Sequence, residues 1–119
     1  MDALKLLTER YSEKKLSAPA PDKHQLTQMF QAALRSPDHG RLQPYRFIVI
    51  EQDKMTELSR LLKSAVHELN LGEERLKKAE NLATRAPMII GVVAKIDPNI
   101  KKVPEWEQLL CAGCATYAI

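Results

Sequence analysis

Apolar side chains recur along the chain at helical spacing in some segments and as unbroken runs in others. The clearest helix is predicted between Asp22 and Pro37, where apolar neighbours are three or four positions apart, the spacing of one helix face. These neighbours are Leu26, Met29, Phe30 and Ala33. Asp22 is suited to cap this helix, with Gln25 three residues on in a capping box. Pro37 is expected to end it.

Helices are also predicted at both ends of the chain. Asp2 is expected to cap the first, whose apolar side comprises Leu4, Leu6 and Leu7. Pro104 suits the first turn of the last helix. The apolar face of that helix comprises Trp106, Leu109, Leu110, Gly113, Cys114 and Tyr117. Glu105 and Glu107 most simply complete its first turn, where negative charge is favourable.

The middle of the chain predicts two strands around a pair of helices. The segment YRFIVIE, residues 45–51, and the segment MIIGVVA, residues 88–94, read as strands. The second is an unbroken apolar run, which favours burial on both faces. Between them, a helix from Asp53 has an inner face of Met55, Leu58, Leu61, Leu62 and Ala65. Residues 69–85 predict a short charged helix with turns.

Two strands rarely make a stable sheet without further cover. We therefore expect an α+β fold, of which this chain holds the N-terminal part. The alternative is that the apolar end of the last helix docks on the body of the protein. The chain has 119 residues, which predicts a single domain over residues 1–119.

Composition excludes several function classes. The chain is 45% hydrophobic and 28% charged, as in ordinary globular proteins. The net charge of +3 is spread in pairs of basic residues, so a nucleic-acid binder is the least favoured hypothesis. No apolar run approaches 18 residues, and no membrane span is expected. The N-terminus lacks the apolar core of a signal peptide, which favours a cytoplasmic location.

The CAGC motif, Cys111 to Cys114, has three possible interpretations. It could be a redox dithiol or half of a metal site. A structural zinc site usually needs four ligands, and the chain has no second cysteine pair. A thioredoxin-like motif would open a helix, whereas these cysteines come late in one. Packing cysteines are therefore preferred, and neither a metal site nor a structural disulfide is expected.

Two other polar segments are candidates for binding. The segment RYS, Arg10 to Ser12, could clamp a phosphate with a guanidinium and a hydroxyl, or could be a solvated helix end. The connector Arg35 to Ile50 carries Arg35 and His39, and an imidazole can both donate and accept hydrogen bonds. Alternatively, Asp38 and His39 satisfy the backbone of a turn while Arg41 and Arg46 face water. Spacing alone favours the solvated helix end for RYS and leaves the connector open.

No other pattern indicates catalysis. The four glycines are scattered, and neither a Rossmann nor a Walker loop is present. His24 and His67 lie among polar neighbours in predicted helices and are interpreted as surface residues. No pair of carboxylates and no nucleophile–histidine grouping can be assembled from the sequence.

Four blocks together carry a resemblance to a known family. They are MDALKLLTERYS, SPDHGRLQPYRFIVI, RAPMIIGVVAK and VPEWEQLLCAGCATYAI. In order and separation they resemble the flavin-dependent nitroreductases, in particular the short-chain bacterial NAD(P)H nitroreductases. The resemblance implies an FMN-binding homodimer, with a mainly antiparallel central sheet flanked by helices and FMN at the dimer interface.

The resemblance also implies roles for individual residues. Arg10 and Ser12 match an Arg-x-Ser motif that binds the phosphate region of FMN, with Tyr11 where relatives often carry a second arginine. Arg35 and His39 match residues that contact the flavin. Arg41 stands where many members have asparagine.

Function follows from the same resemblance. It implies an oxidoreductase that passes electrons from NAD(P)H through FMN to a nitroaromatic, a quinone or a similar small acceptor. Such a flavin enzyme needs no catalytic acid or base from the protein. Family members run for roughly another third of a chain. The alternative hypothesis is therefore a catalytically inactive remnant that binds flavin or dimerises.

Overall fold

The chain forms two units, each built from segments that are distant in the sequence. A computed structural model describes residues 2–119. The first unit comprises the residues up to Ala18 together with Met55–Pro87, and the second comprises Pro19–Lys54 together with Met88–Ile119. The expectation of one domain over residues 1–119 stays a prediction.

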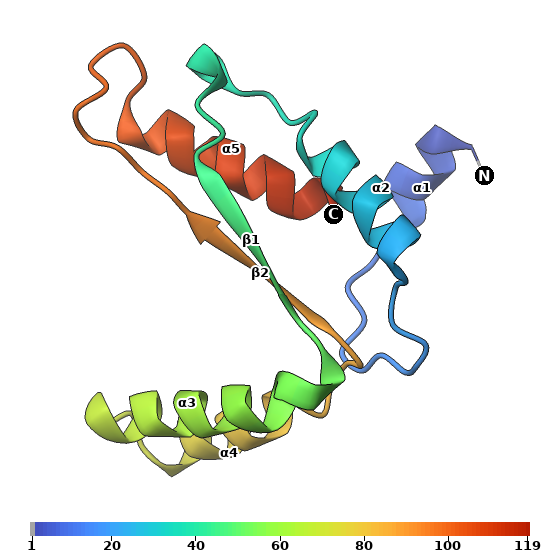
Figure 1. The fold of residues 1–119 in the computed structure, drawn as a ribbon, viewed down its shortest axis with the longest axis vertical. Helices are drawn as coiled ribbons and strands as arrows, with labels where there is room; N and C mark the ends of the chain where they lie inside the picture. Colours follow the sequence, from blue (N-terminus) through green and yellow to red (C-terminus); the bar gives the residue numbers. More distant parts are fainter. Residues whose placement is uncertain (1) are drawn as a thin grey trace. The chain divides into compact units, whose positions relative to one another are not determined.

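The second unit is organised around a two-stranded antiparallel sheet (Figure 1). Strand β1, Tyr45–Ile50, pairs with strand β2, Ile89–Ala94, in a register that sets Tyr45 opposite Ala94 and Ile50 opposite Ile89. Both strands occur within the segments that the sequence predicts. Helices α2, Lys23–Ala33, and α5, Glu105–Ala118, complete this unit.

Helix α2 begins as the sequence predicts. The Asp22 side chain accepts from the Gln25 backbone N–H at 2.8 Å, and the Gln25 side chain accepts from the Asp22 backbone N–H at 2.9 Å. This reciprocal pair satisfies two of the donors that a helix N-terminus leaves without intrahelical partners. The predicted inner face is confirmed, because Ala33 is buried and Leu26, Met29 and Phe30 are half-buried.

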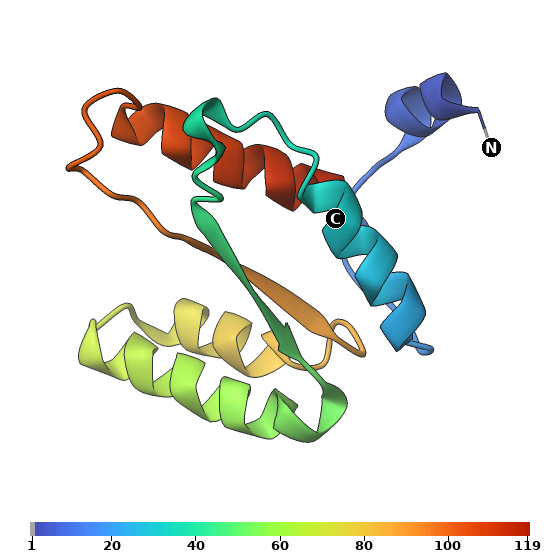
Figure 2. The same ribbon diagram turned by 45° about the horizontal axis from the view of Figure 1, so that its top comes forward.

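Small side chains form the core between α2, β1 and α5. The core comprises Ala33, Tyr45, Cys111, Ala112 and Ala115, with Phe47, Val92 and Ile119 packed against it. Phe30 on α2 stacks on Phe47 on β1 with ring centroids 4.9 Å apart. Because alanines have no bulk beyond Cβ, α2 and α5 pack closely. In Figure 2 the end of α2 lies beside α5.

One prediction about burial is wrong. Strand β2 is not buried on both faces, since Val93 is 45% exposed and the sheet has two strands in the described residues. The apolar face that the sequence indicates for α5 is largely exposed, and the buried residues of this helix are Gln108, Cys111, Ala112 and Ala115. A helix rich in apolar residues on several sides does not reveal from its sequence which side packs inward.

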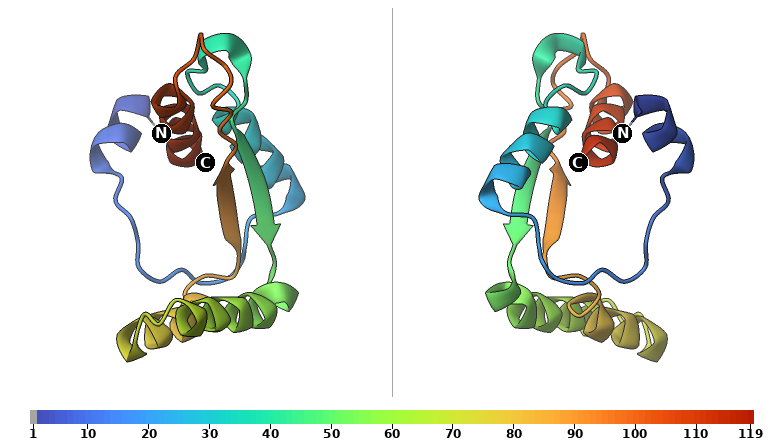
Figure 3. Two further views of the ribbon diagram at one scale, coloured as in Figure 1. Left: turned by 90° about the vertical axis from the view of Figure 1, so that its left-hand side faces the viewer. Right: turned by 90° about the vertical axis from the view of Figure 1, so that its right-hand side faces the viewer.

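The first unit contains a helix pair and an N-terminal arm. Helix α3, Met55–Glu68, packs beside helix α4, Glu73–Leu82 (Figure 3). Of the predicted inner face of α3, Met55 is buried and Leu58 and Leu62 are half-buried, but Leu61 and Ala65 are exposed. Helix α1, Ala3–Glu9, is capped by the Asp2 side chain, as predicted. Among residues 2–119, no helix combines the length and the apolar character needed to cross a bilayer.

One buried side chain holds the loop between β2 and α5. Gln108 is 1% exposed. Its Oε1 accepts from the Asp97 backbone N–H at 2.8 Å, and its Nε2 donates to the Asp97 and Val103 carbonyls, each at 2.9 Å. A buried amide with all of these partners stabilises one loop conformation, because losing the amide would leave backbone groups unpaired.

Replacement of Gln108 should therefore be costly. We expect Gln108→Ala to lower the free energy of unfolding by about 2–4 kcal/mol, measured by urea denaturation followed by circular dichroism. Gln31→Ala is the matched control, because Gln31 is an exposed glutamine on α2. It should change the free energy by less than about 0.5 kcal/mol. Equal effects of the two substitutions would contradict the structural role of Gln108.

The two cysteines are both free thiols, and Cys111 is a core residue. The interpretation of CAGC as packing residues holds for Cys111, whereas Cys114 is half-buried. Burial raises the pKa of the Cys111 thiol, and the negative charge of Asp38 raises it further. A neutral thiol is the form that the core accommodates.

This shift predicts a loss of stability at alkaline pH. The folded state holds the Cys111 proton more tightly than the unfolded state, whose thiol has an ordinary pKa of about 8.5. The stabilisation is therefore complete below that pH and is lost as pH rises through the folded-state pKa. Denaturation under reducing conditions between pH 7 and pH 10 should show a steeper decline for the wild type than for Cys111→Ala. Cys114→Ala, the control, should retain most of the wild-type slope, because Cys114 contributes less to the raised pKa than burial and the charge of Asp38.

Candidate functional site

The polar connector between α2 and β1 is held in shape by Asp38. Its Oδ1 accepts from the Leu42 backbone N–H at 3.0 Å, and its Oδ2 accepts from the Gln43 backbone N–H at 2.8 Å. The negative charge of Asp38 also acts on the buried Cys111 thiol of α5 and helps to raise its pKa. One carboxylate therefore holds the turn through two backbone N–H groups.

The backbone of this turn adopts an uncommon conformation. Gly40 has φ of 77°, Arg41 has φ of 53° and Gln43 has φ of 46°. The last two are non-glycine residues in the left-handed region, which costs free energy and persists only when surrounding contacts enforce it. At Gly40, an added Cβ would lie 3.2 Å from Cγ2 of Val103. The Asp38 hydrogen bonds supply the enforcing contacts.

His39 lies in this turn and pairs with a distant residue. Its Nδ1 is 2.5 Å from Oε2 of Glu107, which belongs to the first turn of α5. The His39 side chain is 51% exposed and that of Glu107 is 27% exposed. His39 therefore does not satisfy the backbone of the turn, which corrects that part of the alternative interpretation. Arg41 and Arg46 are exposed, as that interpretation expected.

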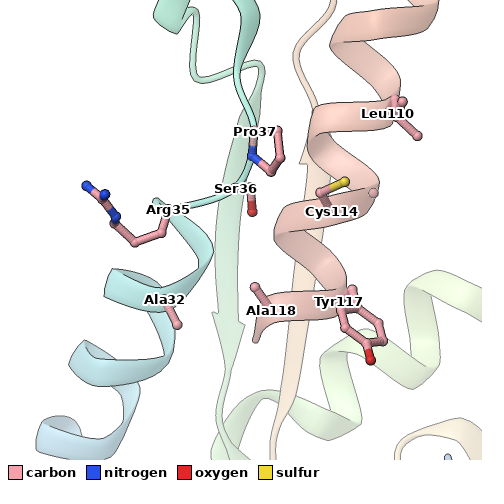
Figure 4. Close-up of a pocket in the computed structure, with 9 residues that line it drawn as sticks. Ala32, Arg35, Ser36, Pro37, Leu110, Cys114, Tyr117 and Ala118 are labelled. Carbon is pink, nitrogen blue, oxygen red and sulfur yellow. The ribbon is translucent and has the colours of Figure 1, made fainter. Parts of the chain in front are cut away.

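Arg35 borders an open groove of about 450 Å³ between the end of α2 and α5 (Figure 4). Its lining includes Arg35, Ser36, Pro37, Leu110, Cys114 and Tyr117. In Figure 4 the guanidinium of Arg35 points away from α5, so its donors are presented at the surface. The Ser36 hydroxyl oxygen is buried without a hydrogen-bond partner. The groove is therefore mainly apolar, with a cation at its edge.

The RYS segment belongs to the first unit. Arg10 Nη2 donates to Ser12 Oγ at 3.0 Å, and Tyr11 is 76% exposed. The arm that follows is tied down by Arg85, whose Nε donates to the Lys14 carbonyl at 3.0 Å and whose carbonyl accepts from the Leu16 backbone N–H at 2.7 Å. The guanidinium and the hydroxyl thus lie together at a fixed point of the surface.

The structure gathers the predicted residues into two groups. Arg10, Tyr11 and Ser12 lie in the first unit, and Arg35 and His39 lie in the second. Within residues 2–119, no group of three or more His, Cys, Asp or Glu side chains is arranged to hold a metal ion. The donors in both groups suit an anionic, polar ligand, because guanidinium and hydroxyl groups bind phosphate and an imidazole nitrogen binds a polar ring.

The sequence matches a family model across nearly its whole length. Residues 7–117 match the model described as the nitroreductase family. The chain belongs to the nitroreductase family.

Two curated relatives of this nitroreductase-family chain are informative. A protein from Haemophilus influenzae, named "Putative NAD(P)H nitroreductase", is 66% identical over all 119 residues, which cover 65% of its length. A protein from Escherichia coli K12, named "Putative NAD(P)H nitroreductase YdjA", is 43% identical over all 119 residues, which cover 64% of its length. The chain therefore spans slightly less than two thirds of these relatives.

Two solved structures share the fold of this chain. A nitroreductase family protein from Clostridium novyi NT is 25% identical, with a TM-score of 0.68 over 99% of this chain and 61% of that protein. A BluB-like flavoprotein from Clostridium difficile 630 is 15% identical, with a TM-score of 0.63 over 99% of this chain and 67% of that protein. The expectation of an α+β nitroreductase-like fold is thus confirmed.

Sequence reasoning missed the residue that pairs with His39. The sequence indicates for Glu107 only a place in the first turn of the last helix, and it does lie in the first turn of α5. The two residues are 68 positions apart, so no local spacing could join them. The role of Asp38 in the turn was foreseen as one alternative, and its acceptance of two backbone N–H groups confirms it.

Removing the Asp38 carboxylate should loosen the turn of this nitroreductase-family chain. We expect Asp38→Ala to speed hydrogen exchange at the Leu42 and Gln43 amides by about tenfold or more, because each loses an acceptor worth about 1–3 kcal/mol. Exchange measured by NMR checks this. Asp53→Ala is the control, since Asp53 is exposed and outside the turn. Unchanged protection in Asp38→Ala would contradict the proposed bracing.

Proposed function

We propose that this chain is the FMN-binding part of an NAD(P)H-dependent oxidoreductase. One observation carries the proposal. The chain is 66% identical, over all 119 residues, to the Haemophilus influenzae protein named "Putative NAD(P)H nitroreductase". The acceptor we propose is a nitroaromatic, a quinone or a similar electron-poor small molecule. The geometry of the polar residues supports a role in holding the cofactor.

The first unit supplies a phosphate-binding pair in this proposal. Arg10 and Ser12 are joined by a 3.0 Å hydrogen bond on the exposed arm. A guanidinium offers a planar set of donors and the hydroxyl offers a rotating one, which together match phosphate oxygens. Tyr11 lies between them in the sequence and is available to cover the ligand. These residues would bind the phosphate end of FMN.

The second unit supplies contacts to the flavin itself. Arg35 presents its guanidinium at the edge of the groove, and His39 has one ring nitrogen held by Glu107. Arg35 would favour negative charge on the cofactor, and His39 would make an oriented hydrogen bond. When bound, FMN supplies the capacity to accept a hydride and to return electrons. The residues of the chain bind and orient it.

We further propose a homodimer that uses the exposed face of α5. Trp106, Leu109, Leu110 and Tyr117 are between 57% and 65% exposed on that helix. Large apolar side chains gathered on one element favour burial against a partner. A second copy of the chain is the partner we propose, in agreement with the resemblance.

The main test is binding of FMN to the purified protein. We expect stoichiometric binding, which is measured by the quenching of flavin fluorescence. Arg10→Ala and Arg35→Ala should each raise the Kd about tenfold or more, because each removes a charge-assisted hydrogen bond. Arg60→Ala is the matched control, since Arg60 is an exposed arginine on α3. Absence of FMN binding, or equal effects of all three substitutions, would overturn the proposal.

A second candidate function is flavin binding without turnover. It is favoured by one observation, that the chain spans 65% of the Haemophilus influenzae relative. The two candidates differ in one measurement on the FMN-loaded protein, which is NAD(P)H oxidation in the presence of a quinone. Oxidation above that of free FMN supports the oxidoreductase, and its absence supports the binding protein.

A further inference from the structure

The pair formed by His39 and Glu107 holds one of the two ring nitrogens of His39. The 2.5 Å approach of His39 Nδ1 to Glu107 Oε2 joins the connector to the first turn of α5. Half of the His39 side chain is exposed. Exposed pairs of this kind contribute little to stability because water solvates both partners. The pair does, however, determine which His39 nitrogen can meet a ligand.

The chemistry of the two groups decides that question. An ionised carboxylate only accepts hydrogen bonds, so the hydrogen between the two atoms is carried by Nδ1. In the neutral ring, Nε2 is then an acceptor with no hydrogen of its own. Glu107 lies in the first turn of α5, so the helix fixes the place from which its carboxylate meets the ring.

The backbone positions of His39 and Glu107 are both fixed by hydrogen bonds of neighbouring residues. The backbone around His39 is braced by the Asp38 hydrogen bonds to Leu42 and Gln43. Glu107 precedes Gln108, whose buried amide fixes the start of α5 to the preceding loop. A side chain whose neighbours are fixed in this way loses less entropy when it binds a ligand.

We propose that Glu107 is a positioning residue that sets the tautomer and orientation of His39. His39 then presents Nε2 as an acceptor to an N–H or hydroxyl donor of the bound flavin, and not as a donor to its phosphate. This inference rests on the proposed function, because FMN is the ligand. Glu107 itself touches no cofactor in this scheme and acts through His39.

The first test measures the tautomer in the protein without added FMN. Ring nitrogen chemical shifts from ¹⁵N NMR distinguish Nδ1–H from Nε2–H, and His39→Ala identifies the signals among those of the three histidines. At a pH where these shifts show a neutral ring, we expect the Nδ1–H form in the wild type. Glu107→Gln should lower its fraction at least about twofold, because an amide can either accept from or donate to Nδ1.

Glu105→Gln is the matched control for this measurement. Glu105 lies in the same first turn of α5, carries the same charge and is exposed. It should leave the tautomer of His39 unchanged. A wild-type ring in the Nε2–H form, or equal effects of the two substitutions, overturns the proposal. Should Glu107→Gln fail to fold, two other measurements test the proposal. They are the tautomer of His39 in the wild type and the Kd for FMN of Glu107→Asp and of His39→Ala.

The second test is a double-mutant cycle on FMN binding. Glu107→Gln should raise the Kd about five- to tenfold in the wild-type background and leave it unchanged in the His39→Ala background, since coupled residues are not additive. Additive effects overturn the positioning role. If the wild type does not bind FMN, the proposed function is wrong, and FMN is not the ligand of His39. The tautomer measurement then still decides whether Glu107 orients the ring.

Discussion

The Asp38 carboxylate is the interaction on which the connector depends. It accepts two backbone N–H groups of the turn, and its negative charge acts on the buried Cys111 thiol of α5. These hydrogen bonds help to hold a turn that contains two non-glycine residues in the left-handed region. The position of His39, and of the strand that begins at Tyr45, follows from that turn. Core packing and the candidate site are thus parts of one arrangement.

Local signals in the sequence predicted the elements well, because their causes are local. The capping box at Asp22 and both strands are set by neighbouring residues, and the structure has them where expected. Which face of α5 is buried could not be predicted, since apolar residues surround much of the helix. Tertiary contacts determine that Cys111 and Ala115 lie in the interior. The unbroken apolar run of β2 indicated burial that two strands do not provide.

The candidate site shows the same division between local and distant causes. Arg10 and Ser12 are two residues apart, and their hydrogen bond could be anticipated from spacing. The pairing of His39 with Glu107 depends on α5 meeting the connector, which no local pattern encodes. Family resemblance pointed to His39 as a ligand-binding residue. It did not indicate how the ring is held, because that information lies in the packing of this fold.

The backbone conformation of Arg41 affects which side chains the turn tolerates at this position. Its φ of 53° belongs to a region that asparagine visits more readily than most side chains, because a short amide can bond to its own backbone. An asparagine at position 41 would therefore strain the turn less than the arginine does. An arginine side chain does not form this short-range hydrogen bond to its own backbone. The residue at position 41 therefore affects the stability of the turn itself, apart from any effect on a ligand.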